Sequence, residues 1–140
     1  MDSEIKIVEG VRNAPIFSVL SARFPLDEDR VVITYGNTIY LNHKEAITQD
    51  LFVHESVHCK QQGYNEADAS NWWDDYLSQK DFRLSQELPA YRAQYAFLKR
   101  HIKDRNKLFL QLRRLSVDLS SPMYGNIIGQ MEALQEIRKG

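Results

Sequence analysis

The sequence is poor in cysteine and has no long apolar run. Cys59 is its one cysteine, so the chain cannot form an intramolecular disulfide bond, which fits a reducing compartment. No apolar stretch is long enough to span a bilayer, and the first residues lack the apolar segment of a signal peptide. These absences predict a cytoplasmic protein that has no membrane partner.

A surplus of charge of one sign is also lacking. The formal net charge is −1, so no bulk attraction toward nucleic acid or membrane is expected. The sequence has neither internal repeats nor low-complexity segments. Its 140 residues are 43% hydrophobic and 26% charged, which is ordinary for a soluble protein and enough to bury a core. We therefore expect one domain that spans residues 1–140.

What the sequence does contain is the stretch His54-Glu55-Ser56-Val57-His58. Residues four apart lie on the same face of a helix, so both imidazoles can point at one place. Neutral imidazole is a good ligand for Zn²⁺. Glu55 follows His54 directly, so it comes near such a metal without binding it, which suits a general base toward activated water. The alternative is a helix that happens to carry two surface histidines.

The residues before this stretch predict a small sheet. Residues 4–9 read as a short strand, and residues 30–35 and 38–42 read as two strands joined by a Gly36-Asn37 turn, which makes a hairpin. Residues 16–20 fit either a short helix or a strand.

A long helix is expected over residues 43–62. Asn42 is its predicted cap, with Glu45 three residues on, and Gly63 is the predicted stop. This places both histidines in the second half of the helix.

The residues after Gly63 predict a loop over 64–70 and a helix over 71–77, with a break at Lys80-Asp81. The next helix is expected over residues 86–105, with Pro89 in its first turn, where proline is tolerated. A final helix is expected over residues 123–137, with Pro122 at its first position.

Glu87 opens the predicted 86–105 helix and is the preferred third metal ligand. A site of two histidines and one glutamate leaves a fourth position open for water. Glu66 is the main rival, but little chain separates it from Gly63. The other acidic residues of this region lie in predicted loops or among aromatic residues: Asp68, Asp74, Asp75 and Asp81.

Residues 99–114 hold seven Lys or Arg and one acidic residue. The commoner explanation is a solvated amphipathic helix. A nucleic-acid surface is the other explanation, but apart from Phe109 this segment lacks the aromatic side chains on which bases stack. A nucleic-acid partner is therefore not expected. Cys59 points about 100° away from His58 around the helix, so we interpret it as a small core residue.

The stretch from His54 to His58, followed by Glu87-Leu88-Pro89-Ala90, resembles the pattern of the gluzincins, a clan of zinc metallopeptidases. In that clan the third ligand is a glutamate from a downstream helix, and the small residue after it lets the two helices pack closely. The chain is also similar to small zincin-like proteins encoded by bacteriophages. Those proteins carry a stretch like Trp72-Trp73-x-x-Tyr76-Leu77 of this chain before the glutamate. The matching motifs lie between Leu51 and Tyr95.

This resemblance implies an α+β, compact, single-domain zincin-like fold. A small N-terminal hairpin would pack on the active-site helix and the glutamate helix, and the C-terminal part would be helical. It implies Zn²⁺ held by His54, His58 and Glu87, with Glu55 as the base. The oxyanion stabiliser would be Tyr91 or Tyr124, although core packing is the commoner role for each. The hairpin would hold an extended peptide substrate by strand addition.

Two functions follow as hypotheses. The first is a zinc metallopeptidase acting on a peptide or protein substrate, in the host cytoplasm if the protein is phage-encoded. The second is a catalytically silent zinc domain that serves protein interaction or phage assembly, because function depends on the site and not on the fold.

Overall fold

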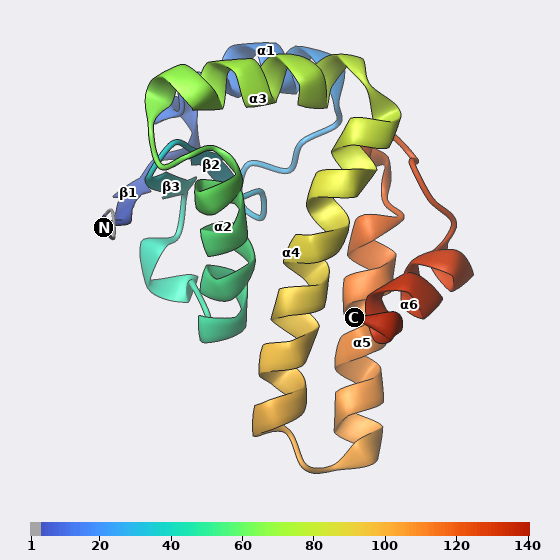
Figure 1. The fold of residues 1–140 in the computed structure, drawn as a ribbon. Helices are drawn as coiled ribbons and strands as arrows, with labels where there is room; N and C mark the ends of the chain where they lie inside the picture. The colour runs from blue at the N-terminus through green and yellow to red at the C-terminus, as the bar shows by residue number, and fades with distance from the viewer. Residues whose placement is uncertain (1–3) are drawn as a thin grey trace.

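Six α-helices and a three-stranded sheet make up residues 4–140, the part of the chain that the computed structural model describes (Figure 1). The α+β class predicted from the sequence is confirmed. No helix of this part is both long and apolar enough to cross a membrane. The strands are β1 (Lys6–Glu9), β2 (Ile33–Tyr35) and β3 (Thr38–Leu41), and the helices are α1 (Phe17–Arg23), α2 (Gln49–Gln61), α3 (Glu66–Ser78), α4 (Lys80–His101), α5 (Arg105–Leu119) and α6 (Gln130–Lys139).

The sheet has the strand order β1-β3-β2. β2 and β3 form the predicted antiparallel hairpin, and Gly36 has a φ of +66° in its turn, a value that glycine adopts without strain. β1 pairs with β3 in parallel, with Lys6 opposite Thr38. β3 is therefore the central strand, so β2 is the edge strand of the hairpin.

The expected helix over residues 43–62 begins later than predicted. The Asn42 side chain caps no helix, because it accepts a hydrogen bond from the Val11 backbone at 2.7 Å. A 3₁₀ turn covers Lys44–Ala46, and α2 begins after Thr48, whose hydroxyl accepts from the Leu51 backbone. The predicted stop is confirmed, since Gly63 follows α2 with a φ of +63°.

The expected loop over residues 64–70 is wrong. The side chain of Asn65 accepts a hydrogen bond from the Asp68 backbone at 2.9 Å and so caps α3, which then runs to Ser78. α4 begins at Lys80, six residues before the predicted start. Pro89 consequently lies inside α4, where it removes one backbone hydrogen bond. Glu87 lies two turns into the helix and not at its start.

The C-terminal prediction is correct only in part. Pro122–Tyr124 form a 3₁₀ turn that ends at Gly125, which has a φ of +84°. The α-helix begins only at Gln130. α4, α5 and α6 lie side by side in Figure 1, so the helical C-terminal part is present.

Two apolar clusters flank the region between α2 and α4. One joins α1, α3 and the sheet, with Trp73 and Ile33 buried in it. The other joins α4, α5 and α6, with Leu112 and Ile137 buried in it. α2 packs against α4, and this contact is polar, as described next.

Candidate metal centre

α2 buries polar side chains along one face. Asp50, His54, His58 and Gln62 recur at intervals of four, and all four are buried. Burying polar groups costs free energy unless they are paired, so a stripe of this kind is not explained by packing alone. The alternative of two surface histidines is wrong, because His54 is only 3% exposed and His58 only 5%.

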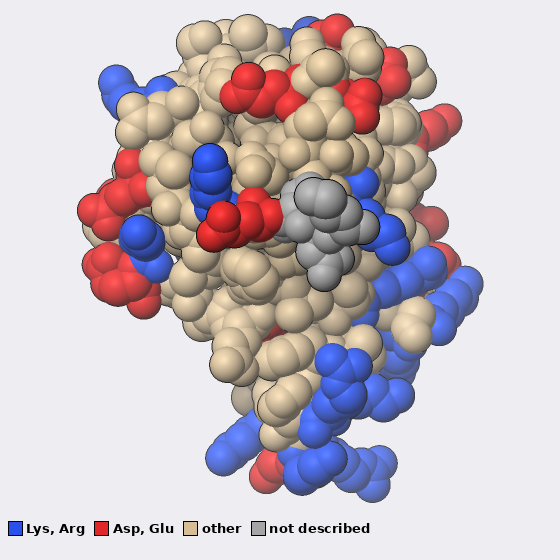
Figure 2. Space-filling view, turned by 60° about the vertical axis from the view of Figure 1, so that its left-hand side comes forward, with Lys and Arg blue, Asp and Glu red and all other residues tan. Residues whose placement is uncertain are grey.

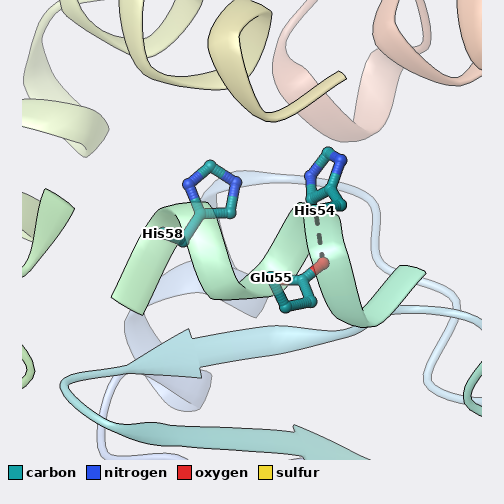
Figure 3. Close-up of side chains that lie close together, drawn as sticks. All are labelled: His54, Glu55 and His58. Carbon is teal, nitrogen blue, oxygen red and sulfur yellow. Dashed lines mark ion pairs between the residues drawn. The ribbon is translucent and has the colours of Figure 1, made fainter. Parts of the chain in front are cut away.

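Both imidazoles project from the same side of α2 (Figure 3). They meet Glu87 of α4, which is itself buried. Its Oε1 lies 3.3 Å from Nε2 of His54 and 3.1 Å from Nε2 of His58. Its Oε2 accepts a hydrogen bond from the Tyr76 hydroxyl at 2.6 Å. Ala90, on the next turn of α4, is fully buried.

Two glutamine side chains orient the imidazoles through the ring nitrogens that face away from Glu87. The Gln94 amide oxygen lies 2.9 Å from Nδ1 of His54, and the Gln61 amide oxygen lies 2.8 Å from Nδ1 of His58. An amide oxygen only accepts, so each Nδ1 carries a proton and each Nε2 faces Glu87. The chain continues outward, because Gln94 donates to Asp50 at 2.8 Å and Arg114 donates to the same carboxylate oxygen.

Glu55 approaches the histidines from the side of the sheet. The Thr34 hydroxyl of β2 donates to its Oε1 at 2.8 Å. Its Oε2 lies 3.9 Å from Nε2 of His54. One donor atom from each of His54, Glu55 and His58 lies within 4.8 Å of the others. Two carboxylates, those of Glu55 and Glu87, are thus available to the same pair of imidazoles.

The charges of His58 and Glu87 stabilise each other. Burial by itself would lower the pKa of His58, but the Glu87 carboxylate and its hydrogen bond raise that pKa to about 9. Burial would raise the pKa of Glu87, yet His58 and His54 hold it well below the ordinary range of glutamate. A buried carboxylate therefore faces a positive charge at the point where the imidazoles converge.

The pKa of Glu55 is shifted the other way. Burial is the main cause and raises it above the ordinary value, although both histidines oppose this. Burial likewise raises the pKa of the Cys59 thiol to about 12. Cys59 is completely buried and stays a neutral thiol, as expected of a core residue.

The acidic rivals of Glu87 lie elsewhere. Glu66, the first residue of α3, is exposed, and among residues 4–140 no rival forms an ion pair with His54 or His58, whereas Glu87 contacts both. The other four rivals are exposed as well: Asp68, Asp74, Asp75 and Asp81.

Both candidate tyrosines reach the site. The Tyr91 ring packs edge-on against the His54 ring, with centroids 4.5 Å apart. Its hydroxyl lies 2.8 Å from that of Tyr124. Burial is the largest cause that raises the pKa of both tyrosines, and the Glu87 carboxylate adds to it. Both hydroxyls therefore stay neutral and able to donate a hydrogen bond.

Two cavities adjoin the centre. A small chamber of about 50 Å³ is lined by His54, Glu55 and His58 on one side and by apolar side chains such as Leu20 and Trp72 on the other. A larger cleft of about 530 Å³ also reaches His54 and Glu55. Its walls come from residues 25–32, from α5 and from residues 121–124. The cleft gives the centre a route to the outside.

Four polar residues of the site were missed in the sequence. Gln94 lies seven residues after Glu87, a spacing that places both on one helix face, so it could have been found. Gln61 follows His58 by three residues and could be found in the same way. Thr34 and Tyr76 come from other elements, so no local spacing indicates their contacts with the two glutamates.

Comparisons with protein-family models, with curated proteins and with solved structures find no match to this chain.

Proposed function

We propose that this protein is a zinc-dependent metallopeptidase and that His54, His58 and Glu87 hold the zinc. The observation that carries the proposal is the position of Glu87 Oε1, 3.3 and 3.1 Å from the two Nε2 atoms. Ligand atoms about 2.0–2.2 Å from a tetrahedral zinc are separated by roughly 3.3–3.5 Å. The two distances from Glu87 Oε1 are close to this separation, which supports Glu87 as the third ligand.

The geometry favours Glu87 over Glu55 as the third ligand. Glu87 Oε1 lies at similar distances from both imidazoles, and its other oxygen is fixed by Tyr76. Glu55 is held to the sheet by Thr34 and its nearer oxygen is 3.9 Å from His54. Two imidazoles and one carboxylate suit zinc and leave a position open for substrate or water.

When bound, zinc would act as a Lewis acid toward the peptide carbonyl and would make water more acidic. Glu55 is placed to accept a proton from water as the water oxygen bonds to the carbonyl carbon. It would then give this proton to the amine nitrogen as the C–N bond breaks. Thr34 would hold Glu55 in position for both transfers.

The paired tyrosines are suited to the carbonyl oxygen. One hydroxyl of the Tyr91–Tyr124 pair donates to the other, so the accepting hydroxyl keeps its own proton for a further hydrogen bond. A donor directed at the developing negative charge lowers the barrier. Tyr124 lines both cavities and is the better placed of the two.

The cleft supplies a path for an extended peptide. Val32, just before the edge strand β2, lines it together with Glu55. The Thr34 carbonyl of β2 is covered, because it accepts from Gln62 and from Trp73. Strand addition at the centre of β2 is therefore disfavoured, and the backbone N–H groups of Arg30 and Val31 before β2 already donate to Asp27.

The test is the variant Glu55→Gln, which keeps the size of the side chain but cannot accept a proton at neutral pH. A general base contributes about 10²- to 10⁴-fold, so peptide hydrolysis should fall by that order while zinc content and melting temperature stay unchanged. Loss of zinc along with activity would make Glu55 a ligand or a support for one. Undiminished cleavage by the variant would contradict the mechanism.

A second candidate is a zinc domain without peptidase activity. One observation favours it: His54, Glu55 and His58 are each no more than 5% exposed, which restricts access to the centre. It predicts zinc binding without cleavage of any peptide, whereas the peptidase predicts a cleavage that is lost in Glu55→Gln.

A further inference from the structure

The charges of this nearly neutral chain are strongly segregated. Residues 99–114 hold seven basic residues and one acidic one, and the rest of the chain holds eleven basic and eighteen acidic residues. Residues 99–114 comprise the end of α4, the connection of residues 102–104 and the first two-thirds of α5. Figure 2 shows the Lys and Arg side chains gathered at the lower end of the molecule, where α4 and α5 are joined in Figure 1.

Most of these cations have no acidic partner. Among residues 4–140, Arg114 alone of the seven makes ion pairs, with Asp50 and Asp118. The single acid, Asp104, accepts from the backbone of Asn106 and Lys107 and caps α5. We call the remaining cations, all exposed, the basic end: Lys99, Arg100, Lys103, Arg105, Lys107 and Arg113.

Although the sequence predicted no nucleic-acid partner, we propose that the basic end binds the phosphate backbone of duplex nucleic acid, without reading its sequence. A duplex carries about one negative charge for each 1.7 Å of its axis. Arg105 and Arg113 lie eight residues apart on α5, which is about 12 Å along a helix. Several phosphates therefore lie within reach of the six cations, and their affinity comes from the release of counterions.

A single strand is the poorer fit. Single-strand binding surfaces combine cations with aromatic side chains on which unpaired bases stack. At the basic end only Phe109 is an exposed aromatic, at 47%. Phe97 is covered, because the His101 ring stacks on it at 4.2 Å and the Arg100 guanidinium lies near its face. No row of stacking surfaces is present there.

A membrane surface is also the poorer fit. Interfacial helices bury a continuous apolar face in the bilayer. The apolar face of α5 is already buried against α4 and α6, through Leu112, Leu115 and Leu119. Phe109 and Leu110 are exposed, and Phe109 shares a hollow with Met131 and Leu134. Arg113 and Arg138 line the same hollow, so charged side chains interrupt this apolar surface.

The test measures binding of a short labelled duplex of mixed sequence by fluorescence anisotropy at several salt concentrations. With about six phosphate contacts, the wild-type affinity should fall by about 10³-fold between 50 and 200 mM salt. The triple variant Lys103→Gln, Arg105→Gln, Lys107→Gln should bind more weakly. Its slope of log affinity against log salt should be smaller by about 0.9 for each cation removed.

Two controls separate position from charge. The variant Lys6→Gln, Lys44→Gln, Lys80→Gln removes the same charge from exposed positions elsewhere and should bind like the wild type. The charge-conserving variant Lys103→Arg, Arg105→Lys, Lys107→Arg should also keep its affinity. Equal losses in both triple Gln variants would overturn the proposal, because any surface cation would then serve.

Other ligands provide the remaining outcomes. Failure to bind the duplex at low salt would overturn the proposal. So would tighter binding of a single strand, of phosphatidylserine vesicles or of polyglutamate, since each would identify another class of partner. None of these measurements depends on zinc or on peptide cleavage, so they test the basic end separately from the proposed peptidase.

Discussion

Glu87 is the residue on which the charge balance of the centre depends. It contacts both imidazoles and the Tyr76 hydroxyl, and no other described carboxylate contacts both histidines this closely. A carboxylate that is 3% exposed is stable only with positive charge beside it. Glu87 raises the pKa of His58 to about 9, so a protonated His58 supplies this charge, and a divalent cation would supply more of it.

We predict that Glu87→Ala weakens zinc binding by more than about 10²-fold, the upper range seen when only an outer-shell partner of a ligand is lost. Glu66→Ala and Asp81→Ala serve as controls, since both carboxylates are exposed and away from the histidines, and neither change should alter the affinity. Competition with a chromophoric zinc chelator measures all three. A largest loss at Glu66 would show that the third ligand is wrongly assigned.

Residue spacing was informative where the contacts lie on one helix. His54, Glu55 and His58 could be grouped from the sequence because a helix brings residues four apart together. A spacing of seven places Gln94 on the face of α4 that carries Glu87, and a spacing of three places Gln61 beside His58. Tyr76 and Thr34 could not be found in this way, since their contacts with Glu87 and Glu55 join separate elements.

At the scale of elements, the hairpin and the end of α2 were predictable and the start of α2 was not. Gly36-Asn37 and Gly63 are local signals, because the turns there need backbone conformations that glycine adopts easily. Asn42 looks like a cap in sequence, but Val11 supplies the donor that its side chain accepts. The polar residues 64–70 suggested a loop, but Asn65 caps α3. The sequence does not separate the two cases, because the same small polar residues are favoured in loops and at helix caps.

Gly63 provides a test at this scale. Its φ is +63°, and an added Cβ would lie 2.6 Å from a carboxylate oxygen of Asp68. We predict that Gly63→Ala lowers the free energy of unfolding by about 1–2 kcal/mol, the cost of the left-handed conformation. Urea denaturation measures this loss.

Gly129→Ser is the matched control. Gly129 has a φ of −77°, a Cβ there would meet nothing within 4 Å, and serine is favoured at the cap of a helix such as α6. The free energy of unfolding of the Gly129→Ser variant should be unchanged or higher. Equal destabilisation by the two substitutions would show that backbone conformation at Gly63 is not the cause.

At the scale of the whole molecule, the polar centre lies between two apolar clusters. α2 packs on α4 and on β2, and hydrogen bonds from Gln94 and Gln61 orient the two imidazoles, so the fold itself holds the proposed ligands in place. The α+β class was predictable from the alternation of strand and helix patterns. The long-range arrangement was not: β3 pairs in parallel with the N-terminal strand, and the cleft is walled by residues 25–32 and by α5.

The proposed zinc site is tested by the amount of zinc that each chain retains. Protein prepared with zinc present and then passed over a desalting column should retain about one zinc per chain by elemental analysis, as a single site of three protein ligands requires. A chelator should remove it and lower the melting temperature, because a ligand that binds only the folded state stabilises that state. Protein that retains no stoichiometric zinc under these conditions would contradict the account.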